Sequence, residues 1–257
     1  MEVHAHTHAH GKKNWKAYFW EFLMLFLAVF CGFLAENQRE HMVEHKREKQ
    51  YILSLTYDLQ ADITHLKTII DNKKKRQIQL DSLTLLLNDP ENKDRGNPIY
   101  YLALQVSRRI PTLFTPNSGT MEQLKNAGLL RLIRKREIVD SITKYDVSTK
   151  NLITLGEIEN TALESFRTTA TRFLNPFEIE KMLDEENNVR RPTNNPPLLD
   201  YSNTDLDEIN YKLYRLKFNN RGGNRDAKKL LIQATNFLLV LKKEYHLSAN
   251  RRTPLEE

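Results

Sequence analysis

The chain has 257 residues, 40% hydrophobic and 28% charged, which excludes a disordered tail and a multi-span transporter. Its few glycines and prolines, 8 and 9, disfavour turn-rich β-sandwiches and barrels. A single cysteine excludes an intramolecular disulfide and cysteine-rich zinc or iron–sulfur sites. The net charge of +6 is too mild to indicate nucleic-acid binding by itself.

Residues 1–14 form a polar arm rich in histidine. Its alternating histidines are His4, His6, His8 and His10. Alternating imidazoles on a flexible arm can bind Ni²⁺, Zn²⁺ or Cu²⁺. The arm is therefore a candidate for weak metal binding, and the alternative is a polar segment without that role.

Residues 15–36, WKAYFWEFLMLFLAVFCGFLAE, predict a transmembrane helix. No residue from Phe22 to Ala35 is charged. With the four residues before it, this stretch gives a helix of roughly 27 Å, close to the ~30 Å of bilayer hydrocarbon. Two tryptophans and a tyrosine near its start are typical of an interfacial aromatic belt.

We expect this span to remain as an uncleaved anchor. Cleavage after Ala35 needs a small residue at the position of Phe33. Lipid attachment at Cys31 needs a small residue at the position of Phe30. Basic residues on the two sides of the span nearly balance, and a large domain crosses a membrane largely regardless of its charge. The arm is therefore expected inside the cell and the domain outside.

One face of the span predicts packing within the membrane. Ala28 and Gly32 form a small-xxx-small pair, and Ala35 continues their face. Glu21 lies two turns before Ala28 on the same face. The open interpretations of Glu21 are placement at the lipid headgroups, packing against a second copy or a partner, and a proton relay.

Residues 37–50 predict a charged helical neck, because glutamates repeat every four residues and apolar side chains are nearly absent. From Tyr51 an apolar stripe of helical spacing runs to Ile70. The polar run DNKKKRQ interrupts the stripe, which resumes at Leu80 and ends before Asp89-Pro90.

Residues 51–184 predict the main helical domain. A helix over 98–109 is followed by a short helix, which a capping box at Thr120 and Gln123 opens and Gly128 ends. A long helix follows from Arg136 to Phe173. We expect it to pair antiparallel with the first long helix.

Residues 185–203 predict a linker, 204–247 a helical hairpin broken at NNRGGN, and 248–257 a polar tail. No useful period-2 alternation appears along the chain. The predicted fold class is all-α, with a single N-terminal transmembrane helix that continues into an antiparallel, coiled-coil-like helical bundle.

Two segments resemble a family of bacterial single-span membrane proteins grouped as a domain of unknown function. The first, a YL..L..DL..D pattern after the span, is matched by Tyr51, Leu55, Asp58, Leu59 and Asp62. The second, a T..LK..G.L.LI pattern, is matched by Leu124, Lys125, Gly128 and Ile133. The resemblance extends to about Phe173, and implies an inner-membrane anchor with a periplasmic helical domain. It implies no activity.

Other patterns give weaker predictions. His41, Glu44 and His45 spell H-x-x-E-H, a zinc-protease motif, but on an exposed neck it is better interpreted as a solvated helix face. The basic clusters 73–76 and 131–136 predict solvated faces, or contacts with lipid or a partner, rather than nucleic-acid binding. The chain has no Gly-rich phosphate loop and no G-x-S-x-G motif, and no cofactor is expected.

The sequence thus predicts a non-enzymatic membrane-anchored helical protein, either a scaffold or an accessory subunit of a membrane complex. One alternative is a ligand-sensing helical bundle that signals through a partner, and another is metal handling through the histidine-rich arm. The expected partners are the lipid bilayer, a second copy through the span, and an unidentified membrane protein. Nucleic acid is not expected.

Overall fold

A computed structural model describes residues 14–89, 96–108 and 113–247. In this part of the chain the structure is all-helical, as predicted, and the only β-type pairing is one isolated bridge between Leu183 and Val189. The elements are α1 (Trp15–Asn88), α2 (Gly96–Ser107), α3 (Gly119–Asn126), the 3₁₀ turn η2 (Leu129–Leu132), α4 (Arg136–Ala170), α5 (Pro176–Glu180) and α6 (Asn203–Glu244). The chain divides into two units, Met1–Gln50 and Tyr51–Glu257, and α1 contributes to both.

The start of α1, in the first unit, is apolar and its side chains are mostly exposed. Its most apolar stretch has a mean hydropathy of 2.0 over 18 residues, and none of that stretch is buried. By length and composition, this helix could cross a membrane. A core helix of the same chain would be covered by its neighbours, which this one is not.

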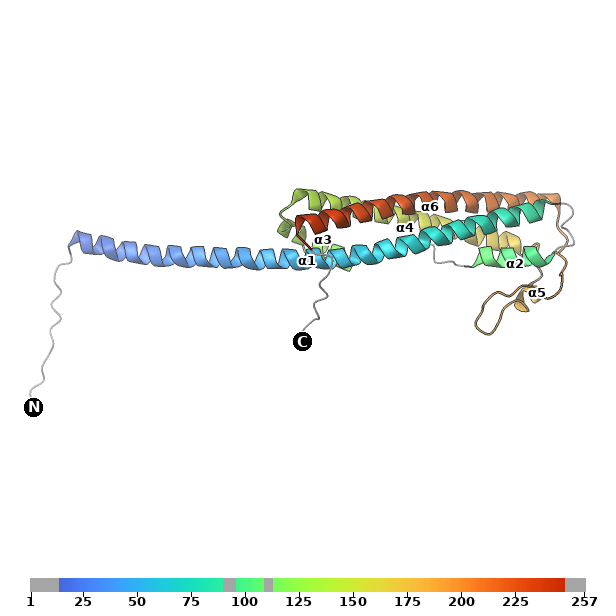
Figure 1. Ribbon diagram of the computed structural model, residues 1–257, viewed down its shortest axis with the longest axis horizontal. Coiled ribbons are helices and arrows are strands. Elements are labelled where there is room, and N and C mark those ends of the chain that lie inside the picture. The colour runs from blue at the N-terminus through green and yellow to red at the C-terminus, as the bar shows by residue number, and fades with distance from the viewer. Residues whose placement is uncertain (1–13, 90–95, 109–112, 248–257) are drawn as a thin grey trace, which may run out of the picture. The chain divides into compact units, whose positions relative to one another are not determined.

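In the second unit, α1 and α4 run in the same direction. Tyr145 of α4 contacts Asp62 of α1, and Glu159 farther along α4 contacts Lys73 farther along α1. Residue numbers therefore rise in the same direction along both helices, which are parallel. The predicted antiparallel pairing of these two helices is wrong. The reason is the path between them: α2, α3 and their connections return the chain to the end at which it started (Figure 1).

Helix α6 is the antiparallel member of the group (Figure 1). Asn210 bonds to Asn88 of α1, and Lys217 pairs with Asp81, so the numbers rise along one helix as they fall along the other. α6 begins with a capping box between Ser202 and Asp205. It continues unbroken through NNRGGN, so the predicted hairpin over 204–247 is one helix of 42 residues.

The start of α3 also differs from the prediction. Its N-cap is Ser118, and Thr120, predicted to open the helix, lies inside it. The backbone N–H of Thr120 donates instead to the carboxylate of Asp58 on α1. A side chain from another helix thus takes the place of the predicted local capping box. Gly128 follows the helix with a positive φ of 63°, as expected for a helix-ending glycine.

The core of the second unit forms two separate apolar clusters. The first joins 52–70 of α1, 138–152 of α4 and 227–241 of α6. The second joins 80–87 of α1, 162–170 of α4 and 209–216 of α6, together with α2. Each long helix therefore passes from one cluster to the other through a short stretch that contributes to neither.

Candidate functional site

The stretch between the two clusters is a polar layer, which we define by five residues: Lys73, Arg76, Glu159, Asn220 and Gly223. The four polar members are buried, although they include three charges. α1, α4 and α6 each contribute to the layer. Burial of charge at this depth is costly unless the charges are paired and hydrogen-bonded, so their partners decide what the layer can do.

Lys73 and Glu159 form a buried ion pair between α1 and α4. The ammonium of Lys73 donates to Glu159 Oε2 at 2.5 Å, and the side chains are 2% and 6% exposed. The second carboxylate oxygen lies 4.0 Å from Nε of Arg76. One carboxylate thus lies between two cations of α1.

The positive charge of Arg76 is also stabilised by backbone carbonyl groups at the carboxyl-terminal end of α2. Its guanidinium donates to the carbonyl oxygens of Val106 at 3.1 Å and Arg108 at 3.4 Å. Arg167 of α4 donates to the neighbouring carbonyl of Ser107. Cations are stabilising at a helix carboxyl terminus, where carbonyl groups lack helical partners. Burial lowers the pKa of Arg76, while the charge of Glu159 opposes that shift.

Asn220 and Gly223 explain why α6 continues through NNRGGN. The Asn220 amide donates to the backbone carbonyl of Lys73 at 2.9 Å and to Gln77 Oε1 at 3.1 Å. A Cβ on Gly223 would lie 2.9 Å from Nζ of Lys73 and 3.7 Å from Glu159 Oε2. Because Gly223 has no side chain, there is room beside it for the ion pair of Lys73 and Glu159.

The sequence carried a signal for this arrangement. Leu213, Leu216, Asn220, Gly223 and Ala227 follow one another at helical steps of three and four, so the buried face of α6 crosses NNRGGN without losing phase. The solvated-face interpretation of cluster 73–76 is likewise wrong for Lys73 and Arg76. Lys74 and Lys75, between them, are exposed.

A second buried acidic group ties α1 to the segment before α3. Asp62, 1% exposed, accepts hydrogen bonds from the Tyr145 hydroxyl at 2.7 Å and from the backbone N–H and amide of Asn117 at 2.8 and 3.1 Å. Burial raises the pKa of Tyr145, and the nearby charge of Asp62 adds to the effect. With the bond from Thr120 to Asp58, these contacts bring together the two segments that carry the family resemblance.

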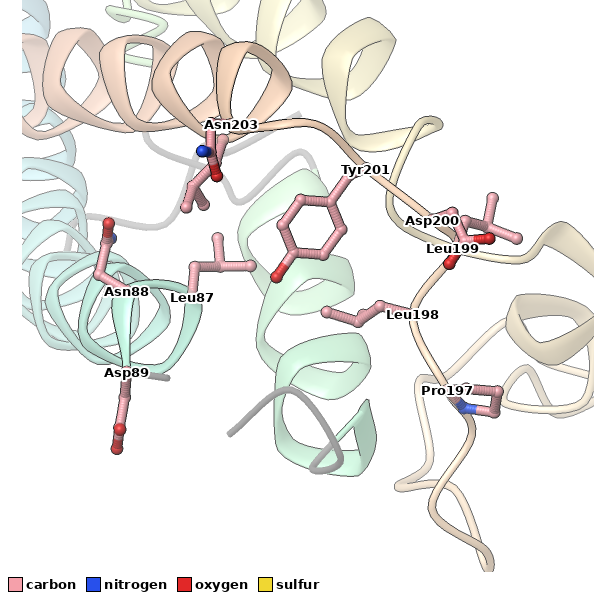
Figure 2. A pocket seen from close by; sticks show the side chains of 10 residues that line it. Leu87, Asn88, Asp89, Pro197, Leu198, Leu199, Asp200, Tyr201 and Asn203 are labelled. Carbon is pink, nitrogen blue, oxygen red and sulfur yellow. The ribbon is translucent and has the colours of Figure 1, made fainter. Parts of the chain in front are cut away.

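A hollow of about 430 Å³ lies where the end of α1 meets the segment before α6. Its lining includes Leu87, Leu198 and Tyr201, and Figure 2 shows the Tyr201 ring between the two leucines. The ring also packs against Phe173, with centroids 4.8 Å apart. The lining has carboxylates at Asp89 and Asp200 but no histidine, cysteine, lysine or arginine.

The predicted packing residues of the span lie on exposed helix surface of the first unit. These residues are Glu21, Ala28, Gly32 and Ala35. A Cβ on Gly32 would meet nothing within 4 Å, so the surface there is open to a neighbour from outside the chain.

The candidate metal ligands have different outcomes. His4, His6, His8 and His10 lie outside the described residues, so their prediction stays open. On the neck, His45 Nδ1 lies 3.3 Å from Glu48 Oε2. Among the described residues, no group of three or more His, Cys, Asp or Glu side chains is placed to hold a metal ion.

The polar layer joins α1, α4 and α6 through an ion pair and the Asn220 amide. Its lysine is neutralised by a carboxylate, and its arginine is bound to backbone carbonyl groups. Comparisons with protein-family models, with curated proteins and with solved structures each found no match to this chain. The resemblance described from the sequence therefore stays a prediction.

Proposed function

We propose that the first part of α1 anchors the protein in a membrane, and that the second unit acts there as a non-enzymatic scaffold or accessory subunit. The observation that supports the anchor is the exposed apolar stretch of α1, with a mean hydropathy of 2.0 and no burial. An apolar surface of this length is stable only when lipid or protein covers it.

The scaffold role is supported by how the second unit is held together. Three long helices share a polar layer that the Lys73–Glu159 ion pair and the Asn220 amide connect, and these contacts favour one alignment. A fixed arrangement of long helices offers surfaces that other proteins can bind.

We further propose that the second unit lies outside the inner membrane of a bacterium, in the periplasm. Alkaline phosphatase fused to the carboxyl end of the full chain should then be active, because it needs oxidising conditions for its disulfides. A green fluorescent protein fused at the same point and exported by the same route should be dark. Fluorescence together with an inactive phosphatase would place the unit in the cytoplasm.

The scaffold role is tested by purifying the full chain in a mild detergent from the membranes of its own cells. A second membrane protein should co-purify with the chain in constant ratio through a sizing column. A chain that elutes alone, at the size of a monomer in its micelle, would contradict the role.

A further inference from the structure

The outer side of α6 carries a stripe of exposed side chains at helical spacing, which we call the α6 seam. Its apolar members are Tyr211, Tyr214, Phe218, Ile232 and Leu239, each more than half exposed. Between the aromatic and the aliphatic members lie Arg221, Arg225 and Lys228, also exposed. All are separated by steps of three, four or seven, which is the spacing of a seam that receives another helix.

The helices of the same unit use the other sides of α6. Leu213 and Leu216 are buried in the core. Glu208 pairs with Arg172 beyond the end of α4, and Lys217 pairs with Asp81 of α1. Arg221 of the seam also pairs with Asp81, at 3.8 Å, so the seam borders α1, while its apolar members stay exposed.

Helix α1 widens the apolar surface beside the seam. Asp81 and Asn88 of α1 contact α6 at Lys217 and Asn210. Leu85 lies between these two contacts and is 73% exposed. This register places Leu85 level with position 213, the residue before Tyr214, so the exposed apolar surface includes side chains of two helices.

The middle of the seam is strongly basic. Residues 212–229 contain seven lysines and arginines and one acidic residue, Asp226. Arg225 bonds to Asp226 and Arg221 pairs with Asp81 of α1, yet the two arginine side chains remain 68% and 66% exposed. A partner that covers the apolar ends must therefore place negative charge opposite the middle.

This charge pattern argues against a second copy as the occupant. In an antiparallel pair centred on Arg225, the apolar ends would match, but Arg225 would face Arg225 and Arg221 would face Lys229. A parallel pair would also set like charges together, and such contacts are costly.

We propose that the α6 seam binds an acidic amphipathic helix of a partner protein. That helix carries apolar residues at the same three-and-four spacing, with aspartate or glutamate at its middle. The seam from Tyr211 to Leu239 is about 42 Å long, enough for a partner helix of similar length. The inference rests on the proposed scaffold role and names the chemistry of the partner.

The test uses a benzophenone amino acid at position 218 of the full chain, irradiated in the membranes of its own cells. The same amino acid at Phe177, which is 71% exposed on α5, is the control. The proposal expects position 218, and not position 177, to cross-link to an acidic helical segment of another protein. A cross-link to the chain itself, to lipid or to a segment that is not acidic would overturn it, as would equal yields at both positions.

Charge reversal gives an independent measure. Arg221→Glu with Arg225→Glu should lower recovery of the cross-linked partner by at least about tenfold, the effect expected at binding hot spots. Arg131→Glu, at an exposed position outside α6, should leave it unchanged. Unchanged recovery in the double variant would overturn the proposal. If a partner co-purifies but does not cross-link at position 218, the scaffold role is supported and the proposal that the α6 seam binds the partner is overturned.

Discussion

The ion pair of Lys73 and Glu159 contributes more to the alignment of α1 with α4 than to the net stability of the fold. Desolvating two charges costs about as much as their attraction returns, so a buried pair adds little net stability. Misalignment of α1 and α4 would leave either charge buried alone, which is far more costly. The pair thus favours one register, in which Lys73 meets Glu159 and Asn220 meets the carbonyl of Lys73.

Lys73→Met should destabilise the second unit by about 3–5 kcal/mol, because Glu159 is left buried without its ammonium partner. Lys74→Met, at the exposed neighbouring position, should change stability by less than about 0.5 kcal/mol. Lys73→Met combined with Glu159→Leu should recover much of the loss. Urea unfolding of the full chain in detergent, followed by helical circular dichroism, measures all three. Equal midpoints for the Lys73 and Lys74 variants would contradict this account of the layer.

Tyr145→Phe removes the hydroxyl bond to the buried carboxylate of Asp62 and should cost about 1.5–3 kcal/mol at neutral pH. The pKa of Tyr145 is raised in the fold, by burial first and then by Asp62. Its contribution is therefore complete below the unfolded pKa of about 10, and is lost as pH rises above that value.

The stability difference between wild type and Tyr145→Phe should accordingly shrink as pH rises through the alkaline range. Urea midpoints measured at pH 8 and pH 11 test this, and the other tyrosines cancel because both chains carry them. A difference that grows with pH would mean that the hydroxyl is not protonated in the fold.

Helix α6 shows how a poor helix sequence is held by its neighbours. Two adjacent glycines at the centre each cost about 0.5–1 kcal/mol relative to alanine. The helix persists because Asn220 and Gly223 face the polar layer, and leucines before and after them are buried.

The two glycines should respond in opposite ways to alanine. A Cβ on Gly222 meets nothing within 4 Å, so Gly222→Ala should stabilise the helix by about 0.5–1 kcal/mol. A Cβ on Gly223 lies 2.9 Å from the Lys73 ammonium, which Glu159 holds in place. Gly223→Ala should therefore destabilise. Thermal unfolding of both variants measures the signs, and stabilisation by both would show that the ion pair tolerates a methyl group.

Sequence periodicity predicted most helices but not their directions or connections. The stripe from Tyr51 to Leu87 and that of α4 each identify a helix, because spacing reports on one helix at a time. Whether two helices run parallel depends on the path between them, which α2 and α3 determine. Spacing also could not show that DNKKKRQ and NNRGGN meet, because that contact joins positions about 150 residues apart.

The division into two units separates two kinds of surface. In the second unit most apolar side chains of the long helices are buried in two clusters, and those of the α6 seam are exposed. In the first unit the apolar side chains are exposed along α1. The buried clusters suit a unit surrounded by water, whereas the exposed apolar start of α1 needs an apolar environment. We propose that this environment is a bilayer.

Self-association through the span is a consequence of that proposal. Helices associate in lipid by close packing, so Ala28 and Gly32 are the surface at which two copies would meet. Gly32→Leu should weaken dimerisation in a membrane two-hybrid assay by at least about fivefold, or ~1 kcal/mol. Leu27→Ala, on another face, should leave it near wild type. Equal signals from wild type and Gly32→Leu would remove the role of this face.

Anchoring itself is tested by washing membranes at high pH, which strips peripheral proteins and keeps inserted ones. The full chain should stay in the membrane pellet at its full length, with its amino terminus intact. A variant with Leu25→Arg and Val29→Arg should be released, because each arginine at mid-span costs about 2.5–3.5 kcal/mol of insertion. Release of the wild-type chain, or equal retention of the double-arginine variant, would contradict a membrane anchor at the start of α1.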